Sequence, residues 1–340
     1  PFWGYQESWL TLTGIMFDMA IYPTLFAWYL ARLWPALGVG AMPLVTGTTM
    51  IAVCVVWNLF SARVVGRGSI VLTLLVLSPF VALVGLALAR APPPGGIMIA
   101  MWNYMGWDNA STVAGEVDRP RRVYPRVMFW AVVAVVLTYL VPILATARAG
   151  VPLALWNTGG WVDIGRLLGG PGLAVAVMLA GAVAVMGTFS ALVLSLSRLP
   201  MVLAADGFLP RIFAWRHPRT LVPVVSLLAC AATWAACQGL GFDRIVMMDV
   251  ILSGLSMLLE FWALVALRVR EPGLRRPFAV PGGLAGAVAV GIGPAVLIGL
   301  AVVRGGAETI GPFNALLVGA VVIALGPVLY LCARVQRGRT

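Results

Sequence analysis

The stretch "WNYMGWDNAST", Trp102–Thr112, places polar residues in the middle of an otherwise apolar segment. That segment, Ile97–Val117, has the length that a helix needs to cross the hydrocarbon core of a bilayer. Unpaired polar groups in hydrocarbon cost several kcal/mol each. Gly106 weakens a helix, and the "DN" and "ST" pairs that follow it are residue types that start helices. We therefore predict a discontinuous helix near residues 97–117, which stops near Tyr104 and restarts near Asn109; the alternative is a continuous helix with one polar face.

Composition predicts that the whole chain lies in a membrane. Hydrophobic residues make up 61% of the 340 residues, and charged residues only 10%. A soluble domain carries about 25% charged residues. Many apolar runs also reach the length of a membrane-spanning helix. We expect an all-α polytopic membrane protein.

The apolar runs divide the chain into about ten candidate spans with short connections rich in Pro, Gly and Arg. Of the 23 basic residues, 17 fall in one set of alternate connections and the C-terminal tail, and 6 fall in the other set. Because basic residues mark the cytoplasmic side, we predict a multi-pass protein of the cytoplasmic membrane with both ends of this chain in the cytoplasm. The predicted spans are 8–31, 42–62, 69–89, 97–117, 125–146, 171–196, 222–237, 245–267, 284–303 and 313–332.

Two connections are longer than the others. The outer one, Ala147–Gly170, is a candidate for a short interfacial helix. The inner one, Arg198–Thr220, has turn residues at Asp206-Gly207 and at Pro210. We expect it to form an amphipathic stretch on the inner leaflet.

Several acidic residues lie within the predicted spans. Asp18 is midway along the first span, Asp108 is in the broken fourth span, and Glu260 is deep in the eighth. An acidic residue inside a membrane span is costly and therefore marks a candidate functional site. Such a residue can hold a proton, bind a cation, or do both. Glu116 ends the fourth span, beside a cluster of arginines. Two roles are possible for it from the sequence, a salt bridge at an inner gate or a part in transport. We predict that Asp108, Glu116 and Glu260 serve proton coupling or gating.

The polar break has the residue types of a substrate site. Transporters use broken helices at the bilayer midplane to present backbone and side-chain groups to a substrate. The positive end of a half-helix attracts anions, but the Asp108 carboxylate offsets that field, so the site favours an amine over a carboxylate. The predicted substrate-binding residues are Asn103, Tyr104, Gly106, Trp107, Asp108, Asn109, Asp18 and Glu260.

Enzymatic and nucleic-acid functions find little support. The sequence has no GxSxG motif, no P-loop and no pair of metal ligands, and His217 is its only histidine. We predict no catalytic residue, no metal and no cofactor. The net charge of +11 is explained by the basic inner connections and not by a nucleic-acid partner.

The same residues resemble a known superfamily, the amino acid–polyamine–organocation (APC) transporters. The segment "WDNASTVAGEVDRPRRVYPR", Trp107–Arg126, resembles the sixth helix of that superfamily and the loop after it. Within the superfamily, the chain is most similar to the polyamine uptake transporters. The stretches that carry this likeness are "PFWGYQESWLTLTGIMFDMAIYPTLF", "WNTGGWVDIGRLLGG", "MVLAADGFLPRIFA" and "SMLLEFWALVALRVREPGLRRPFAVPGG".

The resemblance implies twelve helices, of which the first ten form two inverted repeats with a site between the broken first and sixth helices. The ten spans would then be helices three to twelve of a single transporter domain over 1–340, truncated at its N-terminus. Residues 1–96 would be the remainder of the first repeat, 97–269 the second repeat, and 270–340 the last two helices.

The expected function is secondary active transport of polyamines or amino acids, coupled to protons. The partners would be a small-molecule substrate, protons and the lipid bilayer; the sequence does not define the oligomeric state. One alternative is an amino acid permease or exchanger for neutral or cationic amino acids. An alternative of another class is a non-transporting membrane sensor or assembly partner on the same scaffold.

Overall fold

The computed structural model describes most of the chain in separate ranges. These ranges are 2–59, 120–156, 160–273, 280, 282–305, 309–310 and 313–337. The broken helix predicted near 97–117 and the span predicted at 69–89 lie outside them.

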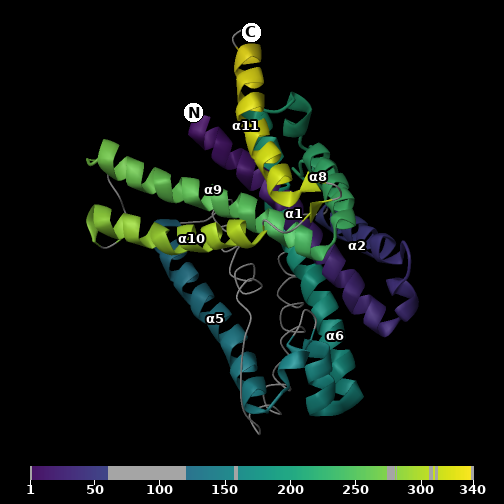
Figure 1. Cartoon of the computed structure of the whole chain (residues 1–340). Helices are drawn as coiled ribbons and strands as arrows, with labels where there is room; N and C mark the ends of the chain where they lie inside the picture. The colour runs from purple at the N-terminus through teal and green to yellow at the C-terminus, as the bar shows by residue number, and fades with distance from the viewer. Residues whose placement is uncertain are drawn as a thin grey trace. The chain divides into compact units, whose positions relative to one another are not determined.

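Helices make up nearly all of the regular structure (Figure 1). Among the described residues, five helices are long and apolar enough to cross a membrane. They are α1 (Phe2–Leu33), α5 (Pro120–Arg148), α6 (Trp161–Leu196, continued by α7, Arg198–Ala205), α9 (Phe242–Arg270) and α11 (Ala315–Arg337). Three more apolar helices join them: α2 (Met42–Asn58), α8 (Val224–Cys237) and α10 (Gly283–Gly305). Eight of the predicted spans are thus helical, and the chain is an all-α polytopic membrane protein.

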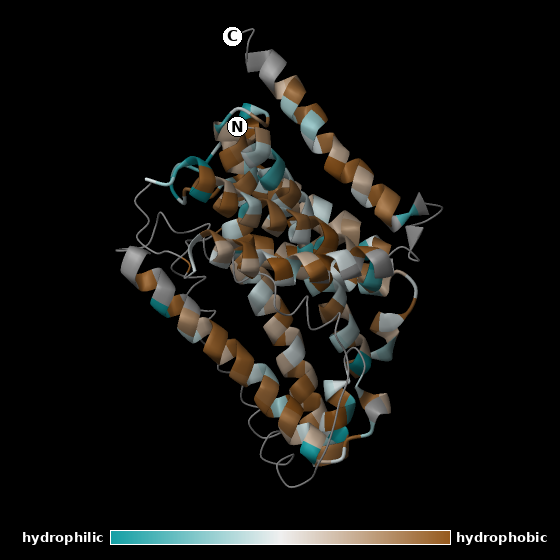
Figure 2. Ribbon diagram, turned by 60° about the vertical axis from the view of Figure 1, so that its left-hand side comes forward, coloured by the Kyte–Doolittle hydropathy of each residue, from teal (hydrophilic) through white to brown (hydrophobic). Residues whose placement is uncertain are grey.

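Short elements connect the long helices. They are the 3₁₀ helices η1 (Pro35–Gly38), η3 (Leu153–Leu155), η4 (Arg211–Ala214) and η5 (Gln238–Leu240), and the strands β1 (Thr309–Ile310) and β2 (Phe313–Asn314). The two strands pair antiparallel, with Thr309 opposite Asn314. Hydrophobic residues run along the long helices, while hydrophilic residues gather mainly near helix ends and in connections (Figure 2).

The predicted helix in the outer connection is confirmed as the first part of α6. The backbone at Gly170 has φ 73° and ψ −169°, a conformation that divides α6 into two helical segments. Glycine adopts positive φ without steric cost, and Pro171 is suited to the first turn of a new helix. The segment from Trp161 to Gly170 is therefore a short helix that precedes the membrane-spanning part.

The chain divides into two compact units, and the boundary falls within α1. Unit 1 comprises Pro1–Ile21 and Leu196–Thr340, and unit 2 comprises Tyr22–Ser195. The predicted division at 96 and 269 into inverted repeats stays a prediction, because residues 60–119, on both sides of the first predicted boundary, lie outside the described residues.

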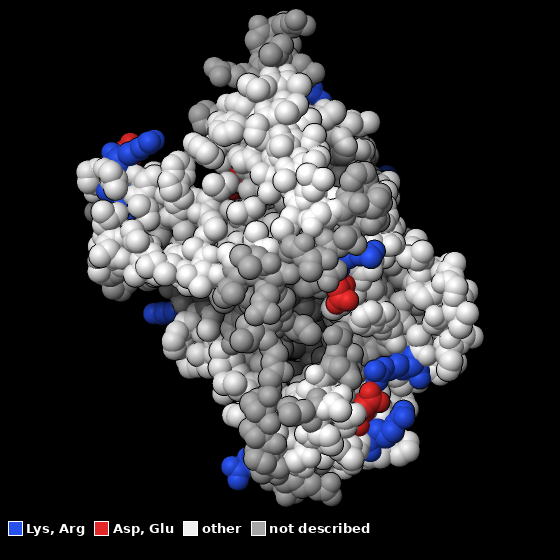
Figure 3. Space-filling model, viewed as in Figure 1, with Lys and Arg blue, Asp and Glu red and all other residues white. Residues whose placement is uncertain are grey.

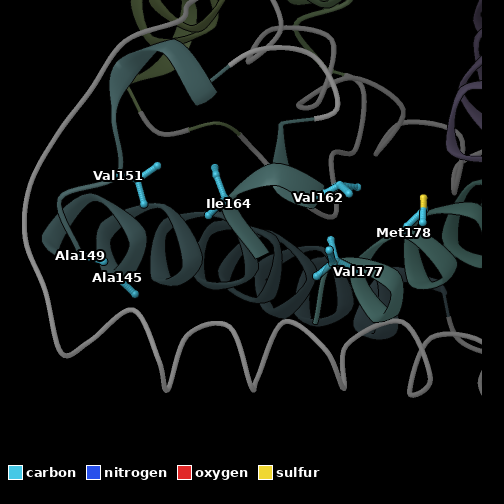
Figure 4. Packing of buried hydrophobic residues seen from close by; sticks show 8 residues of the cluster. Ala145, Ala149, Val151, Val162, Ile164, Val177 and Met178 are labelled. Atoms are coloured by element: carbon cyan, nitrogen blue, oxygen red, sulfur yellow. The ribbon is translucent and has the colours of Figure 1, made fainter. Parts of the chain in front are cut away.

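Unit 2 packs around small and branched side chains from α5, α6 and the connection between them (Figure 4). Ala145, Val162 and Val177 are each 1% exposed in this cluster. Small residues let membrane helices approach closely. Gly181 shows this directly, because a Cβ there would lie 2.7 Å from Cε1 of the Tyr29 ring.

Unit 1 has two apolar clusters on opposite sides of α1. In the first cluster, Tyr5 and Leu12 pack with Leu203 of α7. In the second, Leu10 packs with Met248 and Leu252 of α9, both of which are completely buried. The N-terminal part of α1 therefore lies between α7 on one side and α9 on the other.

The outward faces of the described helices are strongly apolar. Only 17% of the most apolar segment of α5 is buried inside the protein. The side chain of Trp130 on this helix is 66% exposed. Most of the surface in Figure 3 is neither acidic nor basic. Such surfaces would aggregate in water, so they are the faces that contact lipid.

Candidate functional site

One face of α1 carries polar residues at the spacing of a helix. Glu7, Thr11, Gly14 and Asp18 follow one another at intervals of four, three and four residues. Residues at these intervals share one side of an α-helix. Asp18 is partly buried on this face, where the sequence predicted an intramembrane acid.

One face of α9 repeats the pattern. Asp249, Ser253, Ser256 and Glu260 have the same intervals of four, three and four residues. Asp249 is only 2% exposed, whereas Glu260 is exposed. The rest of α9 is largely apolar, so these residues are the main polar face of this helix.

The two polar faces meet at Glu7. The Thr11 hydroxyl donates a hydrogen bond of 2.8 Å to Oε1 of Glu7. The Ser256 hydroxyl of α9 lies 2.6 Å from the Thr11 hydroxyl and 3.1 Å from the same Glu7 oxygen. The other carboxylate oxygen of Glu7 accepts a hydrogen bond of 3.2 Å from Ser8. The Glu7 carboxylate is thus surrounded by three hydroxyl groups from two helices.

The contact continues one turn further along both helices. A Cβ added at Gly14 would collide with the Ser253 hydroxyl and lie 3.1 Å from the Ser253 backbone nitrogen. The Ser253 hydroxyl itself donates a hydrogen bond of 2.7 Å to Oδ1 of Asp249. The absence of a side chain at Gly14 is therefore what allows Ser253, with its bond to Asp249, to face α1.

We call Glu7, Thr11, Ser253, Ser256 and Asp249 the acid–hydroxyl seam. The helices run antiparallel along it, since Trp3 contacts Trp262 with ring centroids 5.2 Å apart while Gly14 meets Ser253. In Figure 1 the ribbons of α1 and α9 cross, in agreement with the hydrogen bonds between them. Hydroxyl groups can both donate and accept hydrogen bonds, so the seam can hold a proton or a cation between two membrane helices.

The predicted site residues divide into two groups. Asp18 and Glu260 lie on the polar faces of α1 and α9, on the two helices that form the seam. The structure thus brings their two helices together, although no local feature of the sequence pairs these helices. The predicted residues that lie outside the described ranges are Asn103, Tyr104, Gly106, Trp107, Asp108, Asn109 and Glu116.

Sequence reasoning missed Glu7 and Ser256. The predicted first span began at Ser8, so Glu7 counted as part of the N-terminal flank, but α1 begins at Phe2. The signal that could have found Glu7 is its spacing of three helical turns from Asp18. Ser256 stands between Asp249 and Glu260 in the same repeated pattern.

Comparisons with known proteins agree on the family of this chain. The family model described as "Amino acid permease" matches residues 1–324. The polyamine transporter RMV1 of Arabidopsis thaliana is 32% identical over 317 residues, covering 88% of this chain and 64% of the relative. The polyamine transporter PUT1 of Oryza sativa subsp. japonica is 37% identical over 313 residues, covering 88% of this chain and 59% of the relative.

A third relative, a probable polyamine transporter of Arabidopsis thaliana, is 32% identical over 346 residues, covering 97% of this chain and 71% of the relative. The chain thus spans less than two thirds of the length of the first two relatives. The match nevertheless extends over almost all of its helices. The chain belongs to the amino acid permease family, within the APC superfamily.

Proposed function

We propose that the protein is a secondary active transporter that carries polyamines across the cytoplasmic membrane, coupled to protons. The observation that carries the proposal is the acid–hydroxyl seam, in which carboxylates of two membrane helices are joined to hydroxyl groups. Acids within membrane helices are costly and mark ion or proton pathways. The names of the relatives, polyamine transporters, favour a cationic substrate.

The substrate proposal rests on charge. A polyamine presents several ammonium groups, and a carboxylate binds an ammonium by a charge-assisted hydrogen bond about twice as strong as a neutral one. We propose Asp108 as the charged member of a site in the broken helix, with Asp18 and Glu260 contributing to amine binding. The other proposed substrate ligands are Asn103, Tyr104, Gly106, Trp107 and Asn109.

The proton proposal rests on the seam. Protonating Glu7 removes its charge and replaces an acceptor with a donor, and the Thr11 and Ser256 hydroxyls can reorient to either state. On the antiparallel register of α1 and α9, Asp249 is the acid that we expect at the level of Asp18. We propose Glu7 and Asp249 as proton carriers, in addition to the acids named from the sequence, Asp108, Glu116 and Glu260.

Orientation is part of the proposal. The division of 17 arginines against 6 supports cytoplasmic ends for this chain. In that orientation the Glu7 end of α1 lies toward the cytoplasm and the Asp18 end toward the middle of the bilayer.

A second candidate function is an amino acid permease or exchanger, which the description of the matching family favours. Such a protein would recognise the carboxylate of its substrate as well as the amine. A non-transporting sensor or assembly partner remains the alternative of another class. Substrate-dependent flux separates both transport functions from it.

The test is uptake of labelled spermidine into proteoliposomes that contain the full-length transporter, in competition with unlabelled polyamines and neutral amino acids. We expect polyamines to compete and neutral amino acids not to compete. Asp108→Asn keeps the shape and removes the charge, so it should weaken spermidine uptake about ten- to a hundredfold, because a lost charged partner costs about 1.5–3 kcal/mol. Asp108→Glu is the matched control and should retain part of the activity.

Each outcome has a distinct meaning. Competition by neutral amino acids at lower concentrations than polyamines would favour the amino acid permease. Loss of pH dependence in Asp108→Asn with unchanged spermidine affinity would make Asp108 a proton carrier and not a substrate ligand. Absence of any substrate-dependent flux in the reconstituted full-length wild type, with every helix that the family resemblance implies, would overturn the transport function.

A further inference from the structure

The inner connection between α6 and α8 is a folded element anchored on unit 1. In residues 198–221, α7 is followed by a turn in which the Phe208 backbone N–H donates a hydrogen bond of 2.8 Å to the Leu203 carbonyl. The Phe208 ring packs on Tyr5 of α1 and on Tyr330 of α11, with centroids 4.6 Å and 5.9 Å apart. The Ser226 hydroxyl of α8 donates a hydrogen bond of 2.9 Å to the Phe213 carbonyl. This packing fixes the element relative to α1, α8 and α11.

The part of this element that points away from the helices combines basic and apolar side chains. Residues 211–221 contain three arginines and no acidic residue. All three, Arg211, Arg216 and Arg219, are exposed. Between them stand large apolar side chains that pack on little of the described protein: Ile212 is 61% exposed, Trp215 49% and Leu221 65%.

Leu221 is held outward by a strained backbone. Its φ is +58°, a conformation that residues other than glycine rarely adopt, and among the described residues it is the only one of these with positive φ. Two hydrogen bonds close this turn: the Leu221 N–H donates to the His217 carbonyl at 2.8 Å, and the His217 N–H donates to the Val222 carbonyl at 2.9 Å. Strain that fixes an exposed leucine does not contribute to a core, so it points to a role outside the fold.

A bilayer surface with anionic lipids is complementary to both kinds of side chain. Arginine forms bidentate hydrogen bonds with phosphate. Tryptophan and aliphatic side chains favour the boundary between headgroups and acyl chains. A soluble anion would use the arginines but would leave Ile212, Trp215 and Leu221 in water, whereas a lipid surface accommodates all six side chains.

We propose that residues 211–221 form a binding surface for anionic phospholipids of the adjacent leaflet. The arginines contact headgroup phosphates, and the three apolar side chains enter the headgroup boundary. The inference concerns this surface alone and holds whichever substrate the protein carries. Because the element packs on Tyr5 and Tyr330, bound lipid also stabilises the N-terminal end of α1 and its contact with α11.

The test measures lipid binding by native mass spectrometry. The purified protein is titrated with phosphatidylglycerol in one series and with phosphatidylcholine in another, and the two affinities are compared. Each arginine near an anionic surface contributes about fivefold to affinity. The triple variant Arg211→Gln, Arg216→Gln, Arg219→Gln should therefore lower the affinity for phosphatidylglycerol at least tenfold. The matched control changes three exposed arginines of the other set of connections to glutamine, Arg32, Arg148 and Arg166, and should alter the affinity less than twofold.

A second variant separates lipid binding from folding. Leu221→Gly relieves the positive-φ strain, so it should raise the unfolding temperature in detergent and still lower the affinity for phosphatidylglycerol. Equal loss of affinity in the control triple variant would overturn the proposal, because the effect would then be general electrostatics. Inorganic pyrophosphate is the soluble probe. If it binds as tightly as phosphatidylglycerol and Leu221→Gly has no effect on either, the occupant is a soluble anion and the proposal is wrong.

Discussion

Replacing Gly14 with alanine tests the packing of α1 on α9 that forms the acid–hydroxyl seam. The new Cβ would collide with the Ser253 hydroxyl and would lie 3.1 Å from the Ser253 backbone nitrogen and 3.4 Å from its Cβ. The hydroxyl can rotate away, but the backbone nitrogen can move only with α9. Inserting a methyl group into a packed contact costs about 1–3 kcal/mol.

A matched glycine supplies the reference. Gly299 lies inside α10, and no described atom lies within 4 Å of a Cβ built there. Gly→Ala at an open helical position gains up to about 1 kcal/mol from helix propensity. Both variants share this gain, so the difference in unfolding free energy between Gly14→Ala and Gly299→Ala should be about 1–3 kcal/mol. Unfolding by SDS titration in mixed micelles measures that difference.

The partner residue identifies the cause. Ser253→Ala removes the colliding hydroxyl, so the combined variant Gly14→Ala, Ser253→Ala should be more stable than the sum of the two single changes predicts, by about 0.5–2 kcal/mol. Additive effects would mean that the Ser253 backbone, and not its hydroxyl, causes the cost of the new methyl group. Equal or higher stability of Gly14→Ala relative to Gly299→Ala would refute the close approach of α1 and α9.

Three further predictions concern other parts of the chain. The Arg32–Asp163 salt bridge, at 2.9 Å, joins side chains that are 37% and 36% exposed, so Arg32→Ala should cost less than about 1 kcal/mol in the same unfolding titration, and a larger loss would mean a buried role. Asn58 is 2% exposed and donates hydrogen bonds to α6; Asn58→Leu should therefore cost about 1–3 kcal/mol, and an unchanged titration would contradict that bond. In intact cells, Val123→Cys should resist an impermeant maleimide while Val39→Cys reacts, since the two exposed positions fall on opposite sides of the proposed membrane orientation; the reverse result would invert the topology.

The positions of the spans could be predicted because the length of an apolar run is a local property of the sequence. Eight predicted spans are helices in the structure, and errors are concentrated at the ends, as at α1, which begins at Phe2 and not at Ser8. The turn residues Gly170 and Pro171 likewise marked the division of α6 from sequence alone. Glycine and proline act on the backbone directly, so their effect does not depend on the rest of the fold.

The seam could not be predicted in the same way. Asp18 and Glu260 stood out because each is an acid in an apolar span, but nothing local pairs α1 with α9, which are more than 200 residues apart. That pairing depends on Gly14 meeting Ser253 and on Leu10 packing against Leu252, contacts that exist only in the folded chain.

Proton movement during transport tests the central claim, that the seam couples spermidine uptake to protons. The full-length protein is reconstituted in vesicles that contain a pH-sensitive dye, and spermidine is added outside. The wild type should acidify the lumen as labelled spermidine enters. Glu7→Gln should exchange labelled for unlabelled spermidine without acidification, whereas Glu271→Gln, which changes an acid at the end of α9 outside the seam, should behave as the wild type. Spermidine accumulation by the wild type at constant lumen pH, or acidification by Glu7→Gln equal to that of the wild type, would contradict the account.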